Sequence, residues 1–124
     1  MGKIIEVRKM KIKKIIQYLN NFASDLKKIY GNVSVILVGS YARGDYNVWS
    51  DVDVLIVVKR ADSNPLKRYD KLIPVLLKYE IPIEPIIITE KEFFRGLSKK
   101  NPLIVESIKY GKVIRDDLNI VVKS

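Results

Sequence analysis

Residues 38–57 read VGSYARGDYNVWSDVDVLIV, and this stretch decides the expected fold. An apolar run ends at Gly39 and Ser40, ten residues follow, and a second apolar run then carries Asp51 and Asp53. The pattern predicts a strand, a glycine turn with a short helix, a loop and a second strand. Side chains two residues apart in a strand point to the same face, so the two Asp side chains should lie side by side.

This pair of acids gives the stretch its expected chemistry. Two carboxylates on one face repel each other unless a cation lies between them, and hard oxygen ligands at that spacing suit Mg²⁺. Leu55 and Val57 continue the same face, so the acids stand at the mouth of a buried strand, where unpaired charge is costly. The Gly39-Ser40 turn offers backbone N–H groups to an anion. A metal-binding acid pair beside a phosphate cradle indicates phosphoryl or nucleotidyl transfer; exposed polar residues at a strand end are the alternative.

The spacing of these features resembles a known family. Gly-Ser, ten residues and Asp-x-Asp are similar to the core motif of the DNA polymerase β-like nucleotidyltransferase superfamily. GSYARGDYNVWSDVD resembles in particular its minimal nucleotidyltransferases, small prokaryotic proteins often paired with a helical HEPN-domain protein. Turn, spacing, acid pair and flanking strands all agree, which makes the match more specific than a lone glycine pattern.

The resemblance implies a fold and a set of catalytic residues. The fold would be α/β, a short mixed β-sheet with helices packed mainly on one face and the cleft on the other. In the family the two Asp residues bridge two metal ions, and the matching positions are Asp51 and Asp53. A third carboxylate comes from a neighbouring strand, and Glu84 has that order and context, although alone it would be an ordinary exposed acid. All three are expected to be both catalytic and metal-binding.

The residues after the first strand are expected to bind the nucleotide. Gly39 and Ser40 match the family's phosphate-binding turn, although Ser40 is equally suited to cap the short helix. Arg43 follows, and a guanidinium beside a phosphate site stabilises the charge of a triphosphate; a solvated surface charge is the alternative. Three aromatic side chains leave base recognition open, because loop aromatics also pack down as lids: Tyr41, Tyr46 and Trp49.

The length and composition of the chain limit which other functions are possible. The chain has 124 residues, and we expect residues 1–124 to form a single minimal nucleotidyltransferase domain. It contains no cysteine and no histidine, which excludes disulfides, thiolate nucleophiles, Cys or His zinc sites and His general bases. A net charge of +9 suits nucleotide, RNA or an acidic partner, and equally a solvated lysine-rich surface. No apolar run approaches the roughly 20 residues of a membrane span, so we expect a cytoplasmic protein without membrane contact.

Apolar periodicity and turn residues place the other elements. Upstream of residue 89 the pattern predicts a helix from Lys9 to Ile29, strands at 33–38 and 52–58, a helix opened by Ser63-Asn64-Pro65 and kinked at Pro74, and an edge strand within 81–89. Downstream it predicts a helix with a Thr89–Glu92 capping box, a last helix from Asn101-Pro102 to Gly111, a strand at 112–115, and an apolar run at 118–122 that docks on the body or on a partner.

The function implied by the resemblance is metal-dependent transfer of a nucleoside monophosphate, AMP from ATP in the first instance, to an acceptor hydroxyl. The cofactor would be two Mg²⁺ ions, with Mn²⁺ as the alternative. The length leaves no room for a domain that recognises the acceptor, so a partner protein should present it. The resemblance implies an antitoxin that adenylylates a tyrosine of its HEPN toxin, with RNA reached through that partner.

Two other classes of function stay open from the residues alone. The chain is also compatible with a non-catalytic module that neutralises a partner by contact. A basic RNA-binding protein is the third candidate, and it rests on charge alone. The presence of Asp51, Asp53 and Glu84 favours catalysis over both alternatives.

Overall fold

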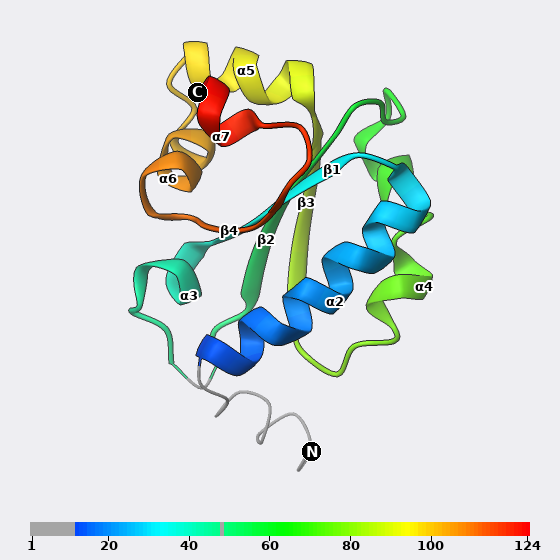
Figure 1. The fold of residues 1–124 in the computed structure, drawn as a ribbon, viewed down its shortest axis with the longest axis vertical. Helices are drawn as coiled ribbons and strands as arrows, with labels where there is room; N and C mark the ends of the chain where they lie inside the picture. The colour runs from blue at the N-terminus through cyan, green and yellow to red at the C-terminus, as the bar shows by residue number, and fades with distance from the viewer. Residues whose placement is uncertain (1–11, 48) are drawn as a thin grey trace.

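A four-stranded sheet in the order β3-β2-β1-β4 forms the centre of the structure, a computed structural model that describes residues 12–47 and 49–124 (Figure 1). The strands are β1 (Val33–Val38), β2 (Val52–Val58), β3 (Ile83–Thr89) and β4 (Lys112–Asp116). Strand β1 is antiparallel to β2 and to β4, whereas β2 and β3 are parallel. The α/β class, the mixed sheet and the bounds of the first two strands are therefore confirmed.

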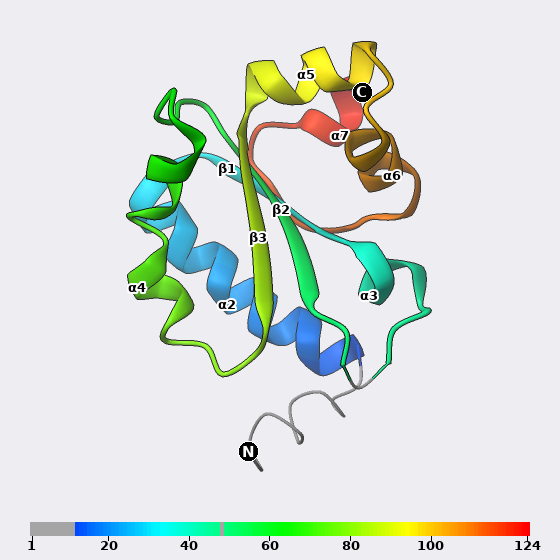
Figure 2. The ribbon, with the colours of Figure 1, turned by 180° about the vertical axis from the view of Figure 1, so that it is seen from behind.

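Helices cover both faces of this sheet (Figures 1 and 2). One face packs against α2 (Ile12–Tyr30), η1 (Pro65–Tyr69) and α4 (Ile73–Leu76). The other face packs against α5 (Glu90–Ser98), α6 (Pro102–Tyr110) and α7 (Ile120–Lys123). We expected helices mainly on one face, and this detail is wrong. An apolar stripe indicates that one side of a helix is buried, but it does not indicate which face of the sheet that side packs against.

The long helix α2 supplies most of the helical contribution to the larger core. Ile15, Leu19, Phe22 and Leu26 recur every three or four residues and are completely buried, as the apolar pattern predicts. Burying each such side chain contributes about 1.5–3 kcal/mol. The expected helix began at Lys9, but residues 9–11 lie outside the described part of the chain. The described helices include none that is long and apolar enough to cross a bilayer.

The segment between β2 and β3 departs from the expectation of one kinked helix. It forms two short pieces, η1 and α4, joined by a turn. As predicted, Pro65 opens the first piece, and the Asn64 side chain accepts a hydrogen bond from the Leu66 N–H at 3.1 Å. Pro74 lies in the first turn of α4, where its missing N–H has no partner to lose, so it begins a helix rather than bending one.

The capping box that opens α5 is confirmed. Thr89 Oγ1 accepts a hydrogen bond from the Glu92 N–H at 3.1 Å, and the Glu92 carboxylate accepts one from the Thr89 N–H at 2.9 Å. These two bonds satisfy N–H groups that a helix start leaves without intrahelical partners. They fix the point at which the edge strand β3 turns into a helix over the second face of the sheet.

The C-terminal run docks on the body of the protein. Leu118 and Ile120 are buried in the second core, and the hydroxyl of the buried Ser34 anchors the segment. That hydroxyl donates to Asp116 Oδ1 at 2.7 Å and accepts from the Leu118 N–H at 3.2 Å. Among the apolar residues of the run, Val122 alone stays exposed. The run is therefore covered by this chain rather than open to a partner.

Candidate active site

The sheet register brings the motif residues to one end of β2. Asp53 and Glu84 are direct partners in the parallel pairing of β2 with β3. Asp53 also lies opposite Val38, the last residue of β1, so the turn that follows β1 at Gly39 reaches the same place. Asp51 precedes β2 by one residue. Residues that are far apart in the sequence thus meet as predicted.

These residues line a cavity of about 430 Å³, within the range of small-molecule sites. Acidic and apolar side chains both line it, and they come from the end of β1, from β2 and the residue before it, from β3 and from α6. The lining residues are Val38, Gly39, Asp51, Asp53, Glu84, Ile86, Leu103 and Glu106. Four of these eight are carboxylates, so the cavity favours a cationic ligand or an anion that carries its own cation.

The electrostatics of Asp53 reflect this crowding. Burial raises the pKa of the Asp53 carboxyl, and the negative charges of Glu84 and Asp51 raise it further. The positive charge of Arg43 acts in the opposite direction on the same pKa. A half-buried, ionised carboxylate beside two other acids is unfavourable when no cation is bound. A divalent cation would offset both the cost of burying the charge and the repulsion between the acids.

The donor set fits a hard divalent cation by its chemistry. Carboxylate oxygens are the ligands that Mg²⁺ prefers, and this ion keeps several waters and binds substrate phosphates. Within residues 12–47 and 49–124, however, no three acidic side chains are already close enough together to hold a metal ion. Asp51 and Glu84 are exposed and Asp53 is half-buried. Water and substrate phosphate would therefore have to complete the metal shell.

Gly39 lets the turn after β1 lie directly against Asp53. Its backbone has a φ of +71°, which disfavours any residue with a Cβ. A Cβ placed there would also lie 2.2 Å from Asp53 Oδ2. Both the backbone conformation and the close approach therefore require glycine. Ser40, the next residue, is half-buried in the first turn of α3 (Gly39–Arg43). The N-cap of α3 is Val38, so the alternative role of Ser40 as the cap is not observed.

Arg43 lies at the end of α3, beside the cavity rather than among its lining residues. Its Nη1 donates to Glu106 Oε1, and its Nε donates to Asp45 Oδ2 at 3.2 Å. These two bonds, that to Glu106 foremost, raise the pKa of the Arg43 guanidinium above its ordinary value. Neither bond uses Nη2. The guanidinium is thus oriented by two carboxylates, and its Nη2 donates to none of residues 12–47 and 49–124.

Sequence reasoning missed Glu106. It lies on α6 three residues after Leu103, and both side chains line the cavity because residues three apart share a helix face. A helical projection places this acid beside the apolar stripe of α6. The projection does not show that this stripe reaches the Asp51–Asp53 end of the sheet, because that depends on how α6 packs.

The aromatic residues of the motif divide into two groups. Tyr41 is buried and stacks on Tyr46, with ring centroids 4.3 Å apart and an interplanar angle of 13°. These two rings pack down and stabilise the base of the loop. Trp49 does not pack down with them, and 73% of it is exposed. Its neighbour Val48 lies outside the described residues.

Comparisons with known proteins place the sequence and the fold among nucleotidyltransferases. The family of nucleotidyltransferase domains matches residues 19–114. Two proteins of Methanocaldococcus jannaschii carry the provisional name protein adenylyltransferase. One is 47% identical over 79 residues, which is 59% of this chain and 78% of the relative. The other is 34% identical over 104 residues, which is 79% of this chain and 69% of the relative.

Two solved structures share the fold. A crystal structure from Sulfolobus solfataricus, provisionally described as a nucleotidyltransferase, has a TM-score of 0.57 at 21% identity and covers 90% of this chain and 85% of its own. A crystal structure of a toxin-antitoxin with AMP-PNP has a TM-score of 0.55 at 15% identity and covers 84% and 82%. At these identities the likeness concerns the fold, and it confirms the polymerase β-like architecture expected from the motif.

Proposed function

The chain belongs to the nucleotidyltransferase domain family, and on that premise we propose that it transfers AMP from ATP to a hydroxyl of a partner protein, with a divalent metal ion as cofactor. The observation that carries the proposal is the convergence of Asp51, Asp53 and Glu84 on one cavity beside Gly39. Nucleotidyl transfer is the activity of the family, and the relatives named above are protein adenylyltransferases by name.

Asp51, Asp53 and Glu84 would hold the metal, as two Mg²⁺ ions or Mn²⁺ in their place. The bound metal supplies two effects: it lowers the pKa of the attacking hydroxyl and neutralises charge on the leaving pyrophosphate. The protein supplies the placement. The direct pairing of Asp53 with Glu84 in the sheet fixes two of the three carboxylates on rigid backbone. Metal ligands that stand on paired strands lose little conformational entropy when the ion binds.

Gly39, Ser40 and Arg43 would bind the phosphates. The lack of a side chain at Gly39 lets the backbone of the turn lie directly against Asp53, where its N–H groups would meet a phosphate bound beside that carboxylate, and Ser40 offers a hydroxyl one residue later. Arg43 is already oriented by Glu106 and Asp45, so its Nη2, which has no partner among the described residues, would donate to a phosphate oxygen without first ordering the side chain. Preorganised donors of this kind stabilise charge that develops during the reaction.

The acceptor is proposed to be a tyrosine of a HEPN-domain toxin, which makes this chain its antitoxin. The names of the adenylyltransferase relatives support a protein acceptor, and the fold likeness to a toxin-antitoxin crystallised with AMP-PNP supports the pairing with a toxin and the choice of ATP. RNA would be reached through that partner. The reaction would take place in the cytoplasm, where ATP and Mg²⁺ are both present.

Mass spectrometry of the partner tests this function. The chain is co-expressed with the protein encoded next to its gene, and the purified complex is incubated with ATP and Mg²⁺. The expected result is the added mass of AMP on a tyrosine of the partner. If the partner binds and is neutralised while its mass stays unchanged, the chain acts as a binding module. If the partner neither binds nor changes mass, it is not the acceptor.

A further inference from the structure

A second cavity, of about 340 Å³, lies on the opposite face of the sheet from the acidic one. Neighbouring residues of β3 mark the two faces: Ile86 lines the acidic cavity, whereas Ile87 lines the second. Successive side chains of a strand point to opposite faces, so the sheet itself separates the cavities. The end of α2, the loop after β2, and η1 with the turn that follows it complete the walls of the second cavity.

Arg68 holds the walls of this cavity together. Its side chain is only 7% exposed. Its Nε donates to the Asp62 carbonyl at 2.7 Å, and its Nη1 donates to the Ile87 carbonyl at 3.2 Å. Both terminal nitrogens also bond to the Glu92 carboxylate, at 2.6 and 3.3 Å. These contacts join η1, the loop after β2, β3 and α5, so the cavity is formed before any ligand arrives.

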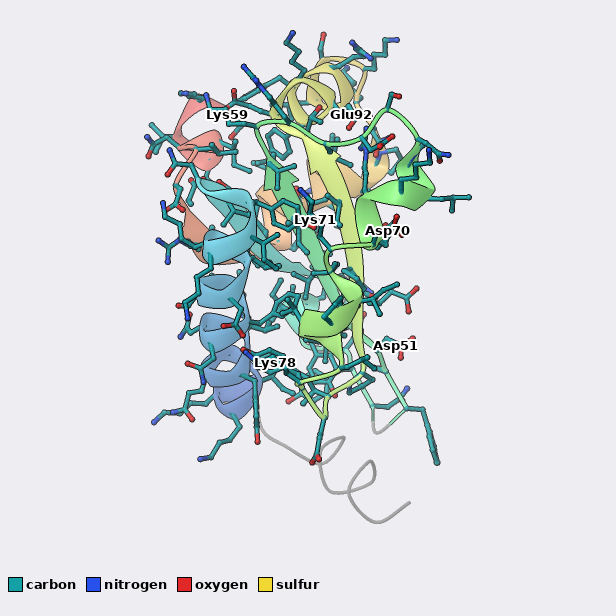
Figure 3. All side chains as sticks on the ribbon, turned by 90° about the vertical axis from the view of Figure 1, so that its right-hand side faces the viewer. Asp51, Lys59, Asp70, Lys71, Lys78 and Glu92 are labelled. Atoms are coloured by element: carbon teal, nitrogen blue, oxygen red, sulfur yellow. The ribbon has the colours of Figure 1, made fainter. Side chains whose placement is uncertain are left out.

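Three other cationic side chains line the cavity, and they differ from Arg68 in having no carboxylate partner among the described residues. Arg60, Lys67 and Lys71 line it from three segments and are exposed. In the part of the chain that the structure describes, none of the three makes an ion pair. Figure 3 labels Lys71 near the middle of the sheet, between Lys59 at one end of β2 and Asp51 at the other.

Two carboxylates oppose these cations but do not cancel them. Asp62 Oδ1 already accepts a hydrogen bond from the Asn64 N–H at 2.8 Å, which holds the loop after β2. Asp70 is exposed on the turn after η1. Arg68 is balanced by Glu92, so three cations face two carboxylates, one of which is engaged by the backbone. The net charge around this cavity is therefore positive, whereas the net charge around the acidic cavity is negative.

The remaining walls are apolar. The half-buried Tyr30 ring and the buried Ile87 side chain line the cavity beneath the cations, and the Tyr30 hydroxyl donates to the Arg68 carbonyl at 3.4 Å. A ligand that fits must therefore carry an anionic group and a flat or apolar part. Its volume must suit a cavity at the lower end of the small-molecule range.

We propose that this second cavity is a binding site for a nucleoside monophosphate. The phosphate lies among Arg60, Lys67 and Lys71, and the base or sugar lies against Tyr30 and Ile87. Cations without ion-pair partners bind a free phosphate directly, whereas the carboxylates of the other cavity accept a nucleotide only together with a metal ion. The site is thus separate from catalysis and does not depend on the proposed reaction.

Titration of AMP in the absence of divalent ions, followed by backbone amide NMR, tests the proposal. The expected result is a saturable shift of amides at 60–62, 67–71 and Ile87. Inorganic phosphate, which lacks the base and sugar, should bind at the same place but more weakly than AMP. Equal binding of the two, or AMP shifts confined to Gly39 and its neighbours, would overturn the assignment.

Matched variants separate a built site from the general basicity of the chain. Lys67→Ala with Lys71→Ala should weaken AMP binding about tenfold or more, since two charged contacts are lost. Lys13→Ala with Lys99→Ala removes the same charge from exposed positions elsewhere and should leave AMP binding unchanged. If both pairs of substitutions weakened AMP binding equally, the binding would be nonspecific electrostatic attraction and the proposed site would be wrong. Asp53→Asn should bind AMP with the wild-type affinity whatever its effect on transfer, whereas clearly tighter binding by this variant, which lacks a carboxylate that repels the phosphate, would place AMP in the acidic cavity.

Discussion

Arg43, the last residue of α3, donates a hydrogen bond to Glu106 of α6, which lies 63 positions later in the chain. The contact joins α3, which contains the proposed phosphate-binding residues, to the C-terminal helix α6 beside the acidic cavity. Arg43 is also oriented by Asp45, so its position is set by two carboxylates that lie outside the three proposed metal ligands. The pair is about one-third exposed, and such pairs contribute little to stability. Its importance should therefore appear in activity.

A double-mutant cycle tests this positioning role. Arg43→Ala should reduce kcat/KM for ATP by an amount equivalent to about 1.5–3 kcal/mol, the range for a hydrogen bond to a charged group. Glu106→Ala should cost less, about 1 kcal/mol, because it misorients the guanidinium without removing it. In the Arg43→Ala background, Glu106→Ala should have no further effect. Steady-state kinetics of all four proteins provide the measurement, and fully additive losses would show that Glu106 acts independently of Arg43.

Gly39 offers a second test, because a matched glycine exists elsewhere in the chain. Gly31 has nearly the same backbone angle, +75° against +71°, but a Cβ at Gly31 would meet nothing within 4 Å. Gly31→Ala should therefore cost about 1–2 kcal/mol of stability, the backbone term alone, and keep its transfer activity. Gly39→Ala has the same unfavourable backbone conformation, and its added Cβ also overlaps the Asp53 side chain. It should be less stable than Gly31→Ala and inactive.

Urea denaturation and the rate of transfer distinguish the two glycine variants. If Gly39→Ala were as stable as Gly31→Ala and still transferred AMP at the wild-type rate, the turn would not need to lie against Asp53. The proposed contact of this turn with the metal-bound triphosphate would then be wrong.

The pairing of Glu92 with Arg68 predicts a specific pH dependence of stability. The Arg68 guanidinium, helped by the Thr89 N–H, lowers the pKa of Glu92 below its ordinary value of 4.5. A lowered folded-state pKa adds stability above pH 4.5 that is lost as the pH falls through that folded-state pKa. Glu92→Gln should thus be less stable than the wild type at neutral pH, and the difference should shrink in acid.

Thermal unfolding of both proteins between about pH 7 and about pH 3 measures this difference. A constant difference across that range would mean that Glu92 stabilises the fold through the capping box alone, without its charge.

The parts predicted from sequence are those fixed by local chemistry or by strand alternation. The capping box at Thr89 and Glu92 is a local pattern, and the strand bounds at 33–38 and 52–58 follow from apolar runs between glycine and polar residues. Glu84 was predicted from the resemblance to the family, in which a neighbouring strand supplies a third carboxylate, and the parallel register of β2 with β3 places it beside Asp53.

The parts that were not predicted depend on packing between distant segments. Glu106 reaches the cavity because α6 packs over the second face of the sheet, and no local pattern specifies that face. The segment around Pro74 divides into two short pieces because tertiary contacts, not periodicity, decide where a marginal helix ends. The cationic cavity likewise depends on packing, because the largely buried Arg68 guanidinium links η1 to the loop after β2, to β3 and to α5.

The central claim is that Asp51, Asp53 and Glu84 bind the metal that drives nucleotidyl transfer. The most direct measurement is the rate of AMP transfer from labelled ATP with Mg²⁺, compared between the wild type, Asp53→Asn and Asp25→Asn. Asp25 is a matched control, since it is also a half-buried carboxylate but lies on α2, where it accepts hydrogen bonds from Lys78 and Tyr79. The account predicts that Asp53→Asn is folded and inactive while Asp25→Asn retains its activity. Transfer by Asp53→Asn at the wild-type rate would contradict it.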